Sequence, residues 1–180
     1  MGRVIQSKSD KFDEGDLVNG LVGWQTHLIS DGKGFTKVPE ILPIPTMINV
    51  LGLTGITAYY GLLDVGQPKE GDTVVVSGAA GATGSVVAQI AKIKGCNVIG
   101  IAGGEEKCAW LEECGLDHVI DYKATKATKE VGRIAKNGID IYFDNVGGPL
   151  LEAVLFKINL NARIVTVSYT HLTLPTNKAV

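Results

Sequence analysis

Hydrophobic and polar positions follow two different patterns along this 180-residue chain, and the change falls near Gly71. From there on, short apolar, β-branched runs are separated by segments with apolar residues at helical spacing. Runs such as VVVS and VIGI are apolar at almost every position, as expected of parallel strands that helices cover on both faces. The pattern predicts an α/β fold with a doubly wound parallel sheet. Strands are expected at 73–77, 97–102, 118–121, 140–144 and 163–167, and helices at about 83–94, 105–114, 125–137 and 149–158.

The first part of the chain shows a different pattern. Residues 2–30 hold short β-prone runs, among them GRVIQSK and LVNGLVGWQTHLIS, separated by turn signals, which is typical of an antiparallel sheet or barrel. Two or three strands cannot close a stable barrel, so the chain is expected to begin inside a β-domain. Three prolines in residues 38–45 favour a linker. The segment TMINVLGLTGITAYYGLLDVG then predicts two short helices.

The composition of the chain argues against several kinds of binding partner. The 17 basic and 19 acidic residues give a net charge of −2, and no basic stripe is present that could neutralise successive phosphates, so a nucleic-acid partner is not expected. The sequence contains no uninterrupted run of about 18 apolar residues, so it predicts no membrane-spanning helix. The three cysteines lack C-x-x-C spacing, which favours reduced thiols over a disulfide framework or a zinc site. We therefore expect a cytoplasmic protein that binds neither membranes nor metal.

The turn after the first predicted parallel strand carries the clearest chemical signal. It contains Ala79-Ala80-Gly81-Ala82-Thr83-Gly84, an A-x-G-x-x-G form of the dinucleotide-binding fingerprint. A strand-to-helix turn of this kind lies at the carboxyl edge of the sheet, where helix N–H groups and the helix dipole favour phosphate. The same glycines also fit a purely structural tight turn.

The end of the second strand indicates which dinucleotide would bind. NAD-binding domains place an acid there for the ribose 2′-hydroxyl, whereas this chain has IAGGEEK, with Gly103 and Gly104 in that place. Lys107 follows within one helical turn and is positioned to meet a 2′-phosphate, which favours NADP. Two alternatives remain at this point: Glu105 or Glu106 could serve a ribose hydroxyl, and Lys107 could simply be solvated.

Taken together, the stretches GWQTHLISDG, GLTGITAYYGLLDVG, GAAGATGSVVAQIAKIKGCNVIGIAGGEEK, DYK and YFDNVGG resemble the zinc-independent medium-chain dehydrogenase/reductases. The similarity points to the group of prostaglandin reductases (leukotriene hydroxydehydrogenases), alkenal double-bond reductases and curcumin reductases. It implies a GroES-like β-barrel domain followed by a Rossmann domain. It also implies NADPH-dependent reduction of the C=C bond of α,β-unsaturated ketones and aldehydes, and a homodimer.

The resemblance also assigns cofactor-binding residues. Gly81, Ala82, Thr83 and Gly84 would hold the pyrophosphate of NADP. Lys107 and Tyr122 would contact the 2′-phosphate and the adenosine side, and Asn145 would lie near the nicotinamide. Leu53 and Thr57 would line the pocket. Without the resemblance, Tyr122 fits an ordinary strand-end aromatic residue, and Asn145 fits a turn.

The chain departs from this family at both ends, and a fragment is therefore expected. Residues 1–45 would be a partial GroES-like domain with its linker, residues 46–167 the Rossmann domain without its last strand, and residues 168–180 a non-native tail. No catalytic residue can be assigned, and this chain alone is expected to be inactive or poorly soluble. The alternatives are an NADPH:quinone reductase of the same superfamily and a non-catalytic NADPH-binding module. The lysine-rich KATKATKE segment is interpreted as a solvated helix face.

Overall fold

The computed structural model describes residues 1–39 and 43–167, which form two compact units. The first unit spans Met1–Leu53, and the second begins at Thr54. The division between the units therefore falls after Leu53, later than the predicted division after residue 45. Part of the predicted linker and the whole predicted tail, residues 168–180, lie outside the described residues.

The first unit contains a small antiparallel sheet, as predicted. Its strands are β1 (Gly2–Arg3), β2 (Leu17–Asn19) and β3 (Thr36–Lys37), in the order β1-β2-β3. Among its described residues Leu17 and Val18 are buried, and the five-residue helix α1 (Ile44–Ile48) follows Pro43.

The prediction of strand structure throughout residues 20–30 was wrong. The segment is irregular, and its large apolar side chains Leu21, Trp24 and Ile29 are fully exposed. Within the described part of this unit no second layer covers them, so alternating hydrophobicity alone could not hold the segment in a sheet.

The second unit is built on a five-stranded parallel sheet, which confirms the predicted fold class. The strands lie in the order β6-β5-β4-β7-β8, and every neighbouring pair is parallel. Three of the five predicted strands match the observed bounds, while β7 and β8 begin earlier than predicted. The strands are β4 (Thr73–Ser77), β5 (Asn97–Ala102), β6 (His118–Asp121), β7 (Ile139–Asp144) and β8 (Ile158–Thr166).

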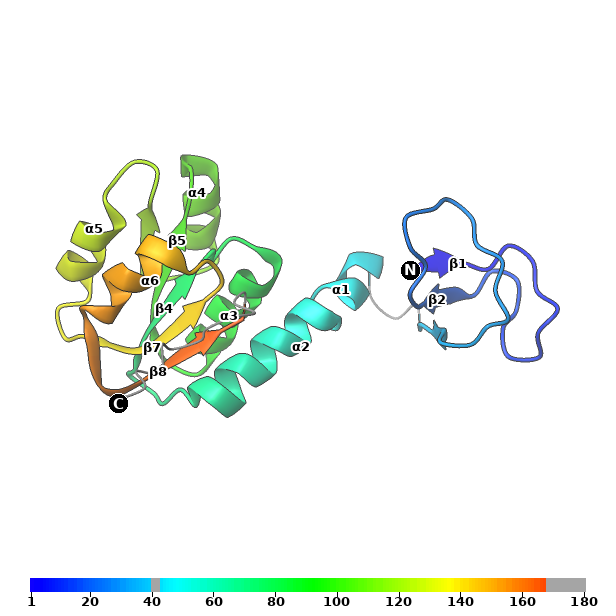
Figure 1. The fold of residues 1–180 in the computed structure, drawn as a ribbon, viewed down its shortest axis with the longest axis horizontal. Coiled ribbons are helices and arrows are strands. Elements are labelled where there is room, and N and C mark those ends of the chain that lie inside the picture. Colours follow the sequence, from blue (N-terminus) through cyan, green and yellow to red (C-terminus); the bar gives the residue numbers. More distant parts are fainter. Residues whose placement is uncertain (40–42, 168–180) are drawn as a thin grey trace, which may run out of the picture. The chain divides into compact units, whose positions relative to one another are not determined.

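Helices cover both faces of this sheet (Figure 1). On one face Val74 and Val76 of β4 pack in a core cluster with Val87 of α3 and Leu111 of α4, while on the other face Val75 packs in a cluster with α5 and α6. This two-sided burial explains why VVVS has no polar alternation. The helices are α2 (Leu53–Tyr60), continued by the π-helical turn η1 (Gly61–Gly66), α3 (Ala82–Ile93), α4 (Glu105–Glu113), α5 (Ala127–Ile134) and α6 (Gly148–Leu155).

The strand order creates a switch point at the centre of the sheet. From β4 the chain continues outward through β5 to β6, then crosses to β7 on the other side of β4 and continues to β8. Loops from the two halves therefore separate at the carboxyl ends of β4 and β7. Open α/β sheets bind ligands in the crevice at this position.

Candidate cofactor site

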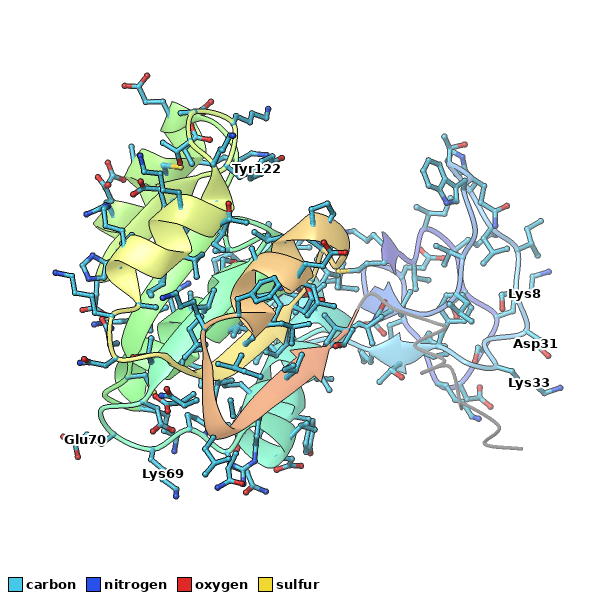
Figure 2. The ribbon with its side chains drawn as sticks, turned by 60° about the vertical axis from the view of Figure 1, so that its left-hand side comes forward. Lys8, Asp31, Lys33, Lys69, Glu70 and Tyr122 are labelled. Atoms are coloured by element: carbon cyan, nitrogen blue, oxygen red, sulfur yellow. The ribbon has the colours of Figure 1, made fainter. Side chains whose placement is uncertain are left out.

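A cavity of about 630 Å³ lies along the carboxyl edge of the sheet in the second unit. Figure 2 shows Tyr122, which follows β6, at the opposite end of this unit from Lys69 and Glu70, which precede β4. The cavity takes residues from the loops after β4, β5, β6 and β7. Its lining residues are Gly78, Ala80, Gly81, Ile101, Ala102, Gly103, Lys107, Tyr122, Lys126, Ala127, Thr128, Val146, Gly147, Pro149 and Leu150.

The glycine-rich turn between β4 and α3 forms one wall of the cavity. Gly78 has φ +58°, a left-handed conformation that glycine adopts without strain, and Gly81 is the N-cap of α3. A Cβ on Gly84 would collide with the backbone of Gly78 and Ala79, so α3 can pack this closely only on glycine. No side chain caps the helix, which leaves its first N–H groups available to an anion.

Gly78 is the turn residue that the sequence analysis overlooked. The fingerprint was aligned with Ala79 in the place of its first glycine, whereas the left-handed residue of the turn is one position earlier. The SG step directly after the apolar strand was the available signal, because such dipeptides mark turns.

The structure shows why glycines, and not an acid, directly follow β5. A Cβ on Gly103 would lie 2.7 Å from ring atoms of Tyr122, so the aromatic ring occupies the space that a larger residue would need. Gly104 has φ +101°, and its N–H donates to Asp121 Oδ1 at 3.0 Å. This bond, together with one from the Lys123 N–H, lowers the pKa of Asp121. The ring of Tyr122 thus favours glycine at position 103, and the positive φ favours glycine at position 104.

The charged residues that line the cavity are all basic. Its lining residues include Lys107 and Lys126 and no Asp or Glu. Glu105 and Glu106, the alternative partners for a ribose hydroxyl, do not line it. The helices α3, α5 and α6 also begin at this edge without a side-chain cap, and helix N-termini add positive potential. The arrangement therefore suits an anionic ligand.

A buried hydrogen-bond network fixes the loop after β7. Asp144 is fully buried, and its Oδ1 accepts hydrogen bonds from four donors. The donors are the hydroxyls of Ser77 (3.1 Å) and Tyr142 (2.9 Å) and the N–H groups of Val146 (3.1 Å) and Gly147 (2.8 Å). Burial raises the pKa of Tyr142, so its phenol stays protonated and remains a donor. The network holds Val146 and Gly147 in the cavity wall.

Asn145 takes part in the same arrangement but does not line the cavity. Its Nδ2 donates to the Ser77 carbonyl at 2.8 Å, and its backbone N–H donates to Ser77 Oγ at 2.8 Å. These two bonds join the ends of β4 and β7 at the switch point. Asn145 thus holds the start of the loop after β7 against the end of β4.

The structure brings together some of the predicted cofactor residues. Gly81, Lys107 and Tyr122 line the cavity. Ala82, Thr83 and Gly84 form the first turn of α3, next to the lining residue Gly81, and Asn145 is hydrogen-bonded to Ser77 and precedes the lining residue Val146. Thr57 of α2 is not a lining residue, and Leu53 belongs to the first unit.

Lys126, a lining residue, was missed by the sequence analysis. Most of KATKATKE is exposed, as the interpretation of a solvated face predicts, and Lys126, Ala127 and Thr128 of this segment also line the cavity. The lysine follows β6 by only a few residues, and loops at the carboxyl ends of parallel strands converge on one edge. That position in the chain was the available signal.

The fold and the cavity define a class of protein: a dehydrogenase-type α/β domain with a cavity at its switch point, the position where such domains bind dinucleotides. Two family models match the chain. The model described as zinc-binding dehydrogenase matches residues 82–179, which include most of the predicted tail, and the model described as N-terminal domain of oxidoreductase matches residues 1–38. The chain belongs to the zinc-binding dehydrogenase family.

Within this family, the chain is similar to several individual reductases. The chain is 47% identical to prostaglandin reductase 1 of Mus musculus over 169 residues (91% of this chain, 51% of that protein). It is 40% identical over 168 residues to 2-alkenal reductase (NADP(+)-dependent) of Nicotiana tabacum (91% and 49%). The crystal structure of CurA in complex with NADPH from Vibrio vulnificus superposes with a TM-score of 0.83 at 48% identity (90% and 49%). The chain spans about half the length of the curated relatives it matches.

The described residues do not provide a zinc site. In residues 1–39 and 43–167 no three His, Cys, Asp or Glu side chains are grouped to hold a metal ion. His27 lies in the irregular segment beside Thr26, and His118 is exposed on β6. Burial raises the pKa of Cys96 to about 11, which keeps its thiol protonated at neutral pH. Over the same residues, every helix is too short or too polar to cross a membrane.

Proposed function

We propose that the second unit is the NADPH-binding part of a reductase that acts on the C=C bond of α,β-unsaturated ketones and aldehydes. One observation carries the proposal: the cavity at the switch point is lined by two lysines and no carboxylate. A ligand with several phosphates suits this cavity, and its volume of about 630 Å³ lies within the range of cofactor pockets.

The geometry of the loops supports each proposed contact. Gly81 and the uncapped N-terminus of α3 bind the pyrophosphate, with Ala82, Thr83 and Gly84 supplying the first helical turn. Lys107 and the half-exposed Tyr122 bind the 2′-phosphate and the adenosine. Asn145 and Asp144 hold the loop after β7, and Val146 of this loop and Leu150 of α6 contribute apolar lining to the cavity.

The substrate class comes from the relatives. Their names include a prostaglandin reductase and a 2-alkenal reductase, and the superposed CurA structure holds NADPH. A bound NADPH supplies a hydride to the β-carbon of such a substrate, and the protein contributes positioning and electrostatics. We assign no catalytic side chain to the described residues.

We also propose a homodimer for the whole protein, and a cytoplasmic location, with which the three free cysteines are consistent.

Two experiments test this function. The purified 180-residue chain is titrated with NADPH and with NADH, and cofactor fluorescence reports binding; NADPH is expected to bind more tightly, and Lys107→Ala should reduce that preference. Equal affinities that the substitution leaves unchanged would contradict the assignment of the 2′-phosphate. In the full-length protein, NADPH oxidation is compared with an enone and with a quinone. Turnover of the quinone alone would support a quinone reductase, and binding without any turnover would support a non-catalytic module.

A further inference from the structure

Lys126 lines the cofactor cavity from an element that the dinucleotide fingerprint does not include. It is the N-cap residue of α5, whereas Lys107 belongs to α4 and Tyr122 follows β6. The three residues thus line one cavity from three segments. Two cations on separate elements can approach one anionic group from different directions, which a single lysine cannot do.

The carboxylates near Lys126 are engaged with other partners. Glu130, at i+4 on the same helix, accepts from Arg133 at 2.9 Å, where Lys126 would otherwise find its natural helical partner. Asp121 Oδ1 accepts from the N–H groups of Gly104 and Lys123. Among the described residues no ion pair involves Lys126, whereas Lys33, Lys37 and Lys92 are each paired with a carboxylate. The charge of Lys126 is therefore available to a ligand.

A phosphate monoester carries a charge of about −1.5 to −2 at neutral pH and offers three acceptor oxygens. One lysine leaves much of that charge uncompensated, and a second lysine can bind a different oxygen through a charge-assisted hydrogen bond. We propose that Lys126 is a second cation for the 2′-phosphate of NADPH, acting with Lys107, and that it sets the preference of this chain for NADPH over NADH. This inference rests on the proposed function of the cavity.

The test separates the 2′-phosphate from the rest of the cofactor. The full 180-residue chain is titrated calorimetrically with 2′,5′-ADP and with 5′-AMP, which differ only in the 2′-phosphate. Lys126→Ala should weaken 2′,5′-ADP binding about threefold to tenfold, in the range of a partly exposed charge pair to phosphate, and leave 5′-AMP binding within about twofold. Lys126→Arg, which retains the charge, should keep most of the affinity.

Lys129→Ala is the matched control, because it removes the same charge from the same helix at an exposed residue that does not line the cavity. It should leave the affinities for both nucleotides unchanged. An equal loss for both nucleotides in Lys126→Ala, or an effect no larger than that of Lys129→Ala, overturns the inference while the cofactor site stands. Failure of the unsubstituted chain to bind NADPH, NADH or either nucleotide overturns the proposed function and the inference with it. Circular dichroism of each variant verifies its fold.

Discussion

The close approach of α3 to the glycine-rich turn can be tested by adding a single methyl group at Gly84. A Cβ there would lie 2.9 Å from Ala79 Cα and still closer to the Gly78 carbonyl oxygen. Carbon atoms in ordinary contact are about 3.5–4.0 Å apart, so the helix and the turn would have to separate by roughly 0.6 Å or more. Because both obstructing groups are backbone, no side-chain rotation can relieve the collision.

The expected free-energy change follows from two opposing effects. Overpacking in a well-packed region costs about 1–3 kcal/mol, and exchanging glycine for alanine inside a helix recovers about 1 kcal/mol. Gly84→Ala should therefore lower the free energy of unfolding by about 1–2 kcal/mol, since the backbone collision places the cost in the upper part of its range. It should also weaken NADPH binding, because α3 would no longer present its N-terminus at the same position.

Gly132→Ala is the matched control for this substitution. Gly132 lies inside α5, and its Cβ would meet only the flexible end of Lys157 at 3.4 Å, so alanine should stabilise the unit by about 0.5–1 kcal/mol. Unfolding in urea is followed by the fluorescence of Trp110 in α4, in a Trp24→Phe background so that the second unit alone is observed. If Gly84→Ala proves as stable as the unsubstituted chain or Gly132→Ala, the argument from close packing is refuted.

Three further outcomes are expected. Gly103→Ala should displace the ring of Tyr122, which is 53% exposed and free to turn outward, so NADPH affinity should fall while the urea midpoint moves little. Burial alone would raise the pKa of Asp117, but hydrogen bonds from Lys92 Nζ and the Val98 N–H lower it overall. The stability that Asp117 contributes is therefore present above its unfolded pKa of about 3.9 and is lost as the pH falls through the folded value, so Asp117→Asn should destabilise the chain at pH 7 and converge with it in acid. The thiol of Cys96, with a pKa raised to about 11 by burial, should resist alkylation at neutral pH until the chain is unfolded, and rapid labelling of the folded chain would contradict its placement.

The unit that buries its strands on both faces was the most predictable part of the chain. The strands VVVS and VIGI could be located from sequence because every residue in them is buried, so pattern and burial agree. The first unit was less predictable, since Trp24 and its apolar neighbours have no described layer to pack against. Hydrophobic alternation indicates a strand only where a partner surface exists.

The sequence by itself determined the parallel α/β architecture, the glycine-rich turn after β4 and the glycines in place of an acid directly after β5, because each of these is a local pattern of spacing and residue type. Only the tertiary structure decided that Gly78 is the left-handed residue of the turn, that Tyr122 fills the space beside Gly103, that Asn145 supports the loop instead of lining the cavity, and that Lys126 shares the cavity with Lys107. These facts depend on which loops meet at the carboxyl edge of the sheet. That meeting is set by strand order, which brings residues distant in sequence together and which no local pattern records.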